Sequence, residues 1–207
     1  QTIAEPEDVV ASPLKGDVNT NSAEYYPAIF VSSDRMIFTR QVGADGRFQG
    51  QEDFYEAREV NGLWQDMGPI RGVNTRGNEG APAVRGDGRR LIFTACETLK
   101  DGYGPRQGKG SCDLFETRWN PSTQRYEEEV NLSALNTRYW ESQPSLSADG
   151  SQIFFVRAQR NEAGEMEQDI WFSTRLNSGE WGKPQRLTDT INTPGREENP
   201  VLHPDGN

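Results

Sequence analysis

Four glutamates recur at one position of a repeated pattern, and they are the first residues whose spacing suggests chemistry. Each follows an Asn-Thr pair and precedes a proline, as in Asn136-Thr137, Glu141 and Pro144. The four carboxylates are Glu24, Glu79, Glu141 and Glu197. If the repeated units surround one axis, the carboxylates ring one mouth of the molecule, where converging negative charge would favour a cation or a basic peptide. The alternative, which recurrence in every unit favours, is that each carboxylate accepts hydrogen bonds from the backbone of the connecting segments.

A second carboxylate recurs once per unit, directly before two large apolar residues. The three positions are Asp53, Asp113 and Asp169. They could form a metal site only if they converged, and each lies at the start of a strand in a separate unit, so we expect structural roles. A zinc site is not expected either, because His203 is the only histidine and no third or fourth ligand has suitable spacing. The sequence predicts no metal and no cofactor.

Catalytic chemistry has little support in the remaining residues. A Ser-His-Asp arrangement has only His203 to work with, and neither a nucleophile elbow nor a zinc-binding helix motif occurs. Residues 104–111 resemble a phosphate-binding loop, but the first spacing is one residue short and Gly110 replaces the required Ser or Thr. Two-carboxylate glycosidase chemistry stays open because acids are abundant, although no pair stands out from the repeat. We predict no catalytic residues.

Aromatic residues flank the repeated glutamate in the first and third units only. They are Tyr25, Tyr26, Tyr139 and Trp140, and the other two units have small or polar residues there. Because aromatics present in some units only are less easily explained as core, we interpret them as candidate partner-binding residues that anchor a protein interface or stack on sugars. The alternative is packing between units. Another set recurs in every complete unit and is expected in the scaffold: Trp64, Tyr126 and Trp181.

These positions are set by a repeat whose glutamates lie 55, 62 and 56 residues apart. After the proline of each later unit comes Asp-Gly, at residues 87–88, 149–150 and 205–206, which favours a type I′ hairpin turn with positive φ at both central residues. An apolar triplet such as Leu91-Ile92-Phe93 follows, typical of a strand buried on both faces. A variable loop, the repeated aspartate, a second turn and a strand opened by Trp or Tyr complete the unit. Each unit therefore predicts four short strands.

Four-stranded units repeated head to tail are the blades of a β-propeller, so we predict an all-β fold of antiparallel blades. The alternative, a flat β-solenoid, usually has shorter repeats. The expected blades are residues 21–75, 76–137 and 138–193. A leading segment, residues 1–20, should contribute one outer strand near residues 11–14, and residues 194–207 should start a further, truncated blade. Because propellers have roughly 4–8 blades, three full blades plus fragments cannot close the ring.

Composition agrees with this interpretation and excludes several partners. The chain has 207 residues, with 21 glycines and 12 prolines spread as punctuation and only 33% hydrophobic residues, which suits many short strands joined by turns. The net charge of −10 argues against nucleic acid, whose binding needs clustered Lys and Arg. No apolar run approaches roughly 18 residues, so no transmembrane segment is expected.

Five stretches resemble a known repeat family. They are residues 78–96, 110–115, 139–156, 169–184 and 191–206. These stretches resemble the WD40-like repeats called PD40, and over about residues 12–207 the chain resembles the propeller of OmpA-family, peptidoglycan-associated outer-membrane lipoproteins of the type IX secretion and gliding machinery. The resemblance implies a β-propeller at the periplasmic face of the outer membrane. It implies peptidoglycan binding only through an OmpA-like domain that is not present in these residues.

The same resemblance bears on the two cysteines. Cys96 ends the second strand of one unit and Cys112 opens the third, so the two residues face each other if those strands pair. Closing the 15-residue loop from Glu97 to Ser111 would stabilise the fold by about 3 kcal/mol in the chain-entropy estimate. In a periplasmic protein we expect a disulfide, and the alternative is two reduced, buried thiols.

Together these observations predict a non-catalytic interaction scaffold. The resemblance implies a periplasmic, outer-membrane-associated protein of a type IX secretion, gliding or envelope-anchoring complex, whose partners are other envelope or secretion-machinery proteins. One alternative is the propeller domain of a hydrolase, either glycan-cleaving or prolyl-oligopeptidase-like, whose catalytic part lies outside these residues. Another is a carbohydrate-binding propeller.

Overall fold

All the regular secondary structure in the computed structural model is β-strand, over the residues that it describes: 10–30, 32, 34–43, 50–161 and 163–203. The first blade is one antiparallel sheet whose strands pair in chain order. Its strands are β1 (Glu24–Ile29), β2 (Arg35–Val42), β3 (Gln51–Val60) and β4 (Leu63–Pro69). Among the described residues no helix has the length and apolarity needed to cross a membrane.

The second and third blades repeat this order. The second contains β5 (Asn78–Val84), β6 (Arg90–Cys96), β7 (Cys112–Asn120) and β8 (Arg125–Asn131). The third contains β9 (Trp140–Leu146), β10 (Gln152–Arg160), β11 (Met166–Thr174) and β12 (Gln185–Arg186). One parallel pair, Cys112 at the start of β7 with Trp140 at the start of β9, links the two blades, so their hydrogen bonding is continuous.

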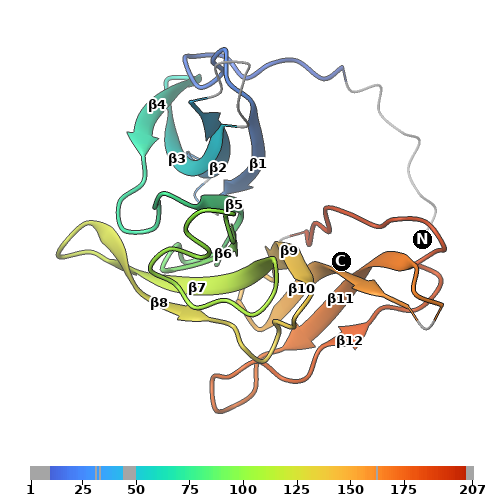
Figure 1. The fold of residues 1–207 in the computed structure, drawn as a ribbon. Coiled ribbons are helices and arrows are strands. Elements are labelled where there is room, and N and C mark those ends of the chain that lie inside the picture. Colours follow the sequence, from blue (N-terminus) through green and yellow to red (C-terminus); the bar gives the residue numbers. More distant parts are fainter. Residues whose placement is uncertain (1–9, 31, 33, 44–49, 162, 204–207) are drawn as a thin grey trace.

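The first strands of successive blades lie next to one another. β1 contacts β5, and β5 contacts β9. Figure 1 shows β5 and β9 near the middle of the molecule and β4, β8 and β12 toward its periphery. Blades that share an inner edge and fan outwards form a β-propeller, so the predicted all-β propeller fold is confirmed, as an open arrangement of three blades with additional segments.

The apolar triplet of each second strand sends alternate side chains to opposite faces of its blade. In β6, Leu91 and Phe93 join a cluster shared with the first blade, whereas Ile92 joins a cluster shared with the third. All three side chains are at most 1% exposed. The predicted burial on both faces is therefore confirmed for β2 and β6, whereas Phe154 of β10 is only partly buried, and most of the hydrophobic core lies between blades.

The Asp-Gly turns are not of the predicted type I′. Gly88 and Gly150 have φ values of 69° and 71°, but the aspartate before each of them does not have positive φ. Each glycine amide donates to the carbonyl three residues earlier, that of Arg85 (2.7 Å) or Ser147 (2.8 Å). A wider loop with a single left-handed residue, which glycine supplies, therefore joins the strands. The third such turn, Asp205-Gly206, lies outside the described residues, as do residues 1–9.

The outer strand expected in the leading segment is absent, because residues 11–14 form no strand. Two backbone hydrogen bonds of 2.8 and 3.1 Å instead join the residues on either side of Gly16 to Trp64 in β4. A Cβ atom on Gly16 would collide with the carbonyl oxygen of Trp64, and Gly72 approaches Tyr126 of the second blade in the same way. The segment is therefore a recurring close-packed loop that needs glycine, and it is not a strand.

The fourth strand of the third blade does not begin at Trp181 as predicted. β12 has 2 residues, and Trp181 forms only an isolated bridge with Arg175. Pro184 lies between them and has no N–H to donate, so the ladder is interrupted. Trp181 is nevertheless 6% exposed and lies in the core cluster between the second and third blades.

A disulfide joins Cys96 and Cys112, which are in register at the ends of β6 and β7. The loop that it closes, residues 97–111, is also tied by a backbone hydrogen bond of 2.9 Å from Glu97 to Ser111. The disulfide therefore clamps the base of a long loop whose ends are already paired.

Removing this disulfide should lower the free energy of unfolding by about 3 kcal/mol, because the unfolded chain regains the entropy of the open loop. The measurement is guanidinium denaturation of the Cys96→Ala/Cys112→Ala variant, with and without reductant. Reductant should lower the midpoint of the original chain and leave that of the variant unchanged. Equal midpoints for the variant and the oxidised original chain would contradict the expectation.

Candidate functional site

The four repeated glutamates are bound within their own units. In each unit the Oγ1 of the repeated threonine donates to the Oε1 of the glutamate, at 2.5 to 2.6 Å. Glu79 and Glu141 have no exposed surface. These carboxylates therefore act as acceptors that shape the entry to each first strand, and they do not form a free acidic ring for a cation.

In the first and third blades, an arginine of the second strand completes this arrangement. Arg40 and Arg157 lie in register with Glu24 and Glu141, and each Nε is 2.8 Å from the carboxylate. The Nη2 of Arg157 also donates to the carbonyl of Leu135 at 2.6 Å, just before the Asn-Thr pair.

Each of these guanidinium groups lies against two aromatic rings. The Cζ of Arg40 is 5.2 Å from the ring centroid of Phe38 and 4.3 Å from that of Tyr55. In the third blade the rings of Phe155 and Trp171 lie 5.5 and 4.3 Å from the Cζ of Arg157. Burial lowers the pKa of Arg157, against the opposing effect of Glu141. In each blade the carboxylate and the two ring faces together offset the free-energy cost of burying the guanidinium charge.

The second blade achieves the same contacts from a different part of the chain. The residue in register with Glu79 is Ala95, which has no charge to offer. Arg106, from the loop of residues 97–111, inserts instead: it contacts Glu79, donates to the carbonyl of Val73 at 2.7 Å, and is 4% exposed. Burial opposes its charged form, but its hydrogen bond to Glu129 and the charge of Glu79 raise the pKa of Arg106 overall.

The stretch that resembles a phosphate-binding loop thus has a structural role. The backbone amides of Lys109 and Gly110 donate to the carboxylate of Asp113, at 2.7 and 3.1 Å. Those are the donors that a phosphate would need, so they are already used.

The three repeated aspartates do not meet. Asp113 also accepts from Asn131 at 2.8 Å, Asp169 pairs with the Nε and Nη2 of Arg186 at 2.8 and 3.1 Å, and Asp53 accepts from Gln51 at 2.7 Å. Burial raises the pKa of Asp53. Each aspartate is therefore held by a partner of its own blade.

A left-handed residue precedes the repeated proline in every unit, and sequence reasoning missed it. The residues are Tyr26, Ala81, Gln143 and Asn199, with φ between 50° and 55°. Strand pairing shifts at this point in all three blades, as at a β-bulge. Bulges re-aim side chains and are frequent beside binding sites. The only signal in the sequence is the proline that follows, which does not reveal the φ of its neighbour.

Three of the four candidate partner-binding aromatics meet at this bulge. Tyr25, Tyr26 and Trp140 line a pocket of about 230 Å³ between the inner strands β1, β5 and β9, together with Glu52 and Gln143. The Nε2 of Gln143 donates to the Oη of Tyr26 at 3.1 Å, which links the third blade to the first. The hydroxyl of Tyr25 donates to the carboxylate of Glu52. Burial, followed by this contact, raises the pKa of Tyr25.

The fourth aromatic, Tyr139, does not line this pocket. Its ring lies 5.0 Å from the Cζ of Arg138, whose Nη2 donates to its hydroxyl at 2.9 Å, and its carbonyl accepts from Ser111. Tyr139 therefore packs at the junction between the second and third blades.

No protein-family model matches the chain, and no curated protein matches it either. Among solved structures, a putative TolB from Agrobacterium tumefaciens is 15% identical with a TM-score of 0.48, covering 85% of this chain and 50% of that one. The hydrazine synthase of Kuenenia stuttgartiensis is 9% identical with a TM-score of 0.47, covering 86% and 46%. A Trypanosoma rangeli sialidase is 10% identical with a TM-score of 0.44, covering 81% and 31%.

The chain thus spans half or less of each of these proteins.

Replacing Arg106 with alanine should lower the free energy of unfolding by about 3–5 kcal/mol, because it leaves the buried Glu79 carboxylate without its cation. Adding Ala95→Arg should recover part of this loss, since residue 95 is in register with Glu79 as Arg40 is with Glu24. Chemical denaturation measures both changes. Arg118→Ala is the control, because that side chain is 57% exposed and should change stability little. A loss at Arg118 as large as that at Arg106, or no recovery with Ala95→Arg, would contradict this account.

Proposed function

We propose that this chain is a non-catalytic β-propeller scaffold that binds a protein partner at the pocket between its inner strands. The observation that carries the proposal is the convergence of Tyr25, Tyr26 and Trp140 from two non-adjacent blades on one pocket. Large aromatics that are partly exposed beside a concave surface are the usual anchors of protein interfaces. These aromatics occur at positions where the units differ, whereas the glutamates and aspartates that repeat in every unit are bonded to partners of their own blades.

The chemistry of the pocket favours a peptide with a basic residue. Glu52 supplies a negative charge beside the tyrosines, whereas the side-chain amide of Gln143 is already bonded to the hydroxyl of Tyr26 (3.1 Å) and to the backbone amide of Asn199 (2.7 Å). A lysine or arginine side chain would find both a carboxylate and aromatic faces there. The net charge of −10 would attract such a partner from a distance.

The resemblance to the PD40 propellers of outer-membrane lipoproteins supports a more specific role. We place the protein in the periplasm, associated with the outer membrane, as part of a type IX secretion, gliding or envelope-anchoring complex. Its partners would then be other envelope or secretion-machinery proteins, and peptidoglycan would be bound only by a separate domain.

A carbohydrate-binding propeller is the second candidate, because Trp140 and Tyr26 could also stack on sugar rings. A hydrolase propeller is less well supported, since Glu52 is the only carboxylate among the described residues that line the pocket and two-carboxylate glycoside hydrolysis needs a pair.

Trp140→Ala should weaken partner binding by about 30-fold or more, the loss expected for a central aromatic anchor. The measurement is a pull-down from envelope membranes with the full-length protein, followed by titration of the recovered partner. Tyr139→Ala is the matched control, because it removes a neighbouring aromatic that does not line the pocket, and it should bind like the original protein. Recovery of no envelope protein, or equal losses in both variants, would refute the proposal. Glycan-array binding that is lost only with Trp140→Ala would favour the carbohydrate alternative.

A further inference from the structure

The groove between the first and second blades is filled by two aromatic rings around one arginine. The Cζ of Arg35 lies 4.3 Å from the ring centroid of Phe30 and 5.5 Å from that of Trp119. Gly88 lies directly against Phe30, because a Cβ atom there would be 2.8 Å from the ring. This groove is closed by packing, with the guanidinium held between ring faces.

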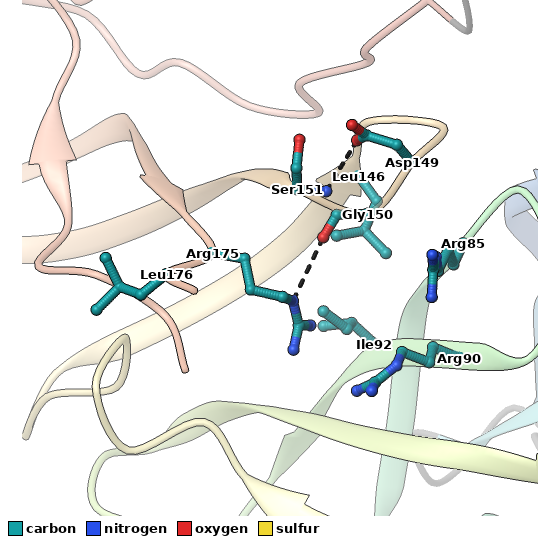
Figure 2. Close-up of a pocket in the computed structure, with 9 residues that line it drawn as sticks. All are labelled: Arg85, Arg90, Ile92, Leu146, Asp149, Gly150, Ser151, Arg175 and Leu176. Atoms are coloured by element: carbon teal, nitrogen blue, oxygen red, sulfur yellow. Dashed lines mark hydrogen bonds between the residues drawn. The ribbon is translucent and has the colours of Figure 1, made fainter. Parts of the chain in front are cut away.

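The equivalent groove between the second and third blades has a different composition. Counting from the repeated proline, Phe30 corresponds to Arg85 and Arg35 to Arg90; counting from the repeated aspartate, Trp119 corresponds to Arg175. Two aromatics are thus replaced by two arginines. The groove contains a pocket of about 240 Å³ whose walls include all three arginines and whose apolar lining includes Ile92 and Leu146 (Figure 2).

Hydrogen bonds fix one of these arginines and leave the other two largely available. Arg175 donates to Glu116 (2.5 Å), to the carbonyl of Gly179 (2.9 Å) and to the carbonyl of Gly150 (3.4 Å). Arg90 contacts Glu116 through one nitrogen only. Arg85 has, within the described part of the chain, a single ion pair at 3.5 Å with an exposed aspartate. Figure 2 shows neither Arg85 nor Arg90 bonded to another residue drawn.

A guanidinium group has five N–H donors, so Arg85 and Arg90 keep most of theirs for a ligand. The position of Arg85 is nevertheless defined, because its side chain lies across Gly150, where a Cβ atom would be 3.0 Å from its Cδ. The site therefore has donors that are positioned but not consumed.

Arginines outnumber carboxylates among the residues that line the pocket. Three arginines line it against one carboxylate, Asp149, over the described residues. That carboxylate is already bonded to the hydroxyl of Ser147 (2.7 Å) and the amide of Ser151 (2.9 Å). Glu116 lies behind Arg90 and Arg175 with its side chain 5% exposed. With Glu116 and the exposed Asp87 that pairs with Arg85, three carboxylates lie near the three arginines, so the unused guanidinium donors of Arg85 and Arg90, and not a net positive charge, favour an anionic ligand.

We propose that this pocket binds a small organic oxyanion, with its phosphate or carboxylate group on Arg85 and Arg90 and a short apolar body against Ile92 and Leu146. The fork of a guanidinium matches two oxygens of either head group. Arg175, held by the backbone of the third blade, supplies fixed positive charge and does not need to move. Nothing in the proposed partner binding at the inner strands requires this site, so the two can be tested separately.

The test is calorimetric titration of the full-length protein with phenyl phosphate at low salt. Arg85→Gln should weaken binding at least about tenfold, because it removes charge-assisted hydrogen bonds to the head group. Arg118→Gln is the matched control: it also removes one positive charge, but from an exposed side chain outside the pocket, and binding should stay within about twofold of the original. Equal effects of the two variants would reduce the site to general charge attraction and overturn the proposal.

A second variant keeps the test independent of how Arg85 is replaced. Arg85→Phe with Arg175→Trp copies the residues of the first groove, so it should fold and no longer bind phenyl phosphate. Benzoate and inorganic phosphate distinguish the head groups, and binding of phenyl phosphate, benzoate or both to the original protein supports the site. Binding of neither aromatic anion, or unchanged binding in the repacked variant with a folded spectrum, overturns it.

Discussion

A buried guanidinium that bridges a carboxylate, a backbone carbonyl and two aromatic rings holds each blade to the segment that enters it. Arg40, Arg106 and Arg157 each make this set of contacts. Taking charges out of water is costly, so each charged group is tolerable only while the others are in place. One guanidinium contacts the entering segment, the glutamate of the first strand, and rings from the second and third strands. The relative position of these parts of a blade therefore depends on the contact between that guanidinium and the glutamate. The hydrophobic clusters between blades can then pack with their triplets correctly aligned.

This fixed register allows the inner strand to carry a strained residue. A non-glycine residue with positive φ is uncommon and unfavourable, and it persists only where the surroundings determine it. Here the bound glutamate lies two residues before the bulge in each unit, and the proline follows it directly. The strain is supported in the same way in every blade, so the identity of the bulge residue is free to differ. Tyr26 and Gln143 are joined by a hydrogen bond, whereas Ala81 lines the same pocket with only a methyl group. The chemistry of the inner pocket is therefore set by residues on which the fold makes little demand.

The repeat made the strands, their order and the two-faced burial of the apolar triplets predictable, because all of these follow from periodicity and local pattern. What periodicity could not supply was any contact that differs between units. Arg106 lies in a loop, so strand pairing does not predict its position, and only the structure reveals that it replaces the arginine missing opposite Glu79. The left-handed bulge and the close approach of Gly16 depend on backbone angles and on a neighbouring strand. Tyr139 looked equivalent to Trp140 in sequence, yet it lies just before the first residue of β9, and only Trp140 lines the pocket.

Comparison of equivalent positions explains how a groove can change its ligand chemistry while the fold is kept. In both grooves a glutamate of the third strand, partly buried in the first and buried in the second, is bound by two arginines: Glu56 by Arg35 and Arg58, and Glu116 by Arg90 and Arg175. In each groove the negative charge of the carboxylate is thus balanced by two guanidinium groups. In the first groove the second arginine comes from the same blade and is 55% exposed, which leaves the space between blades to aromatic rings. In the second groove it comes from the next blade, so an ionic contact replaces ring packing and the rings are no longer needed. The exchange conserves the buried ion pairs while it opens volume beside unused guanidinium donors, and a repeat protein can acquire a binding site in this way without altering its core.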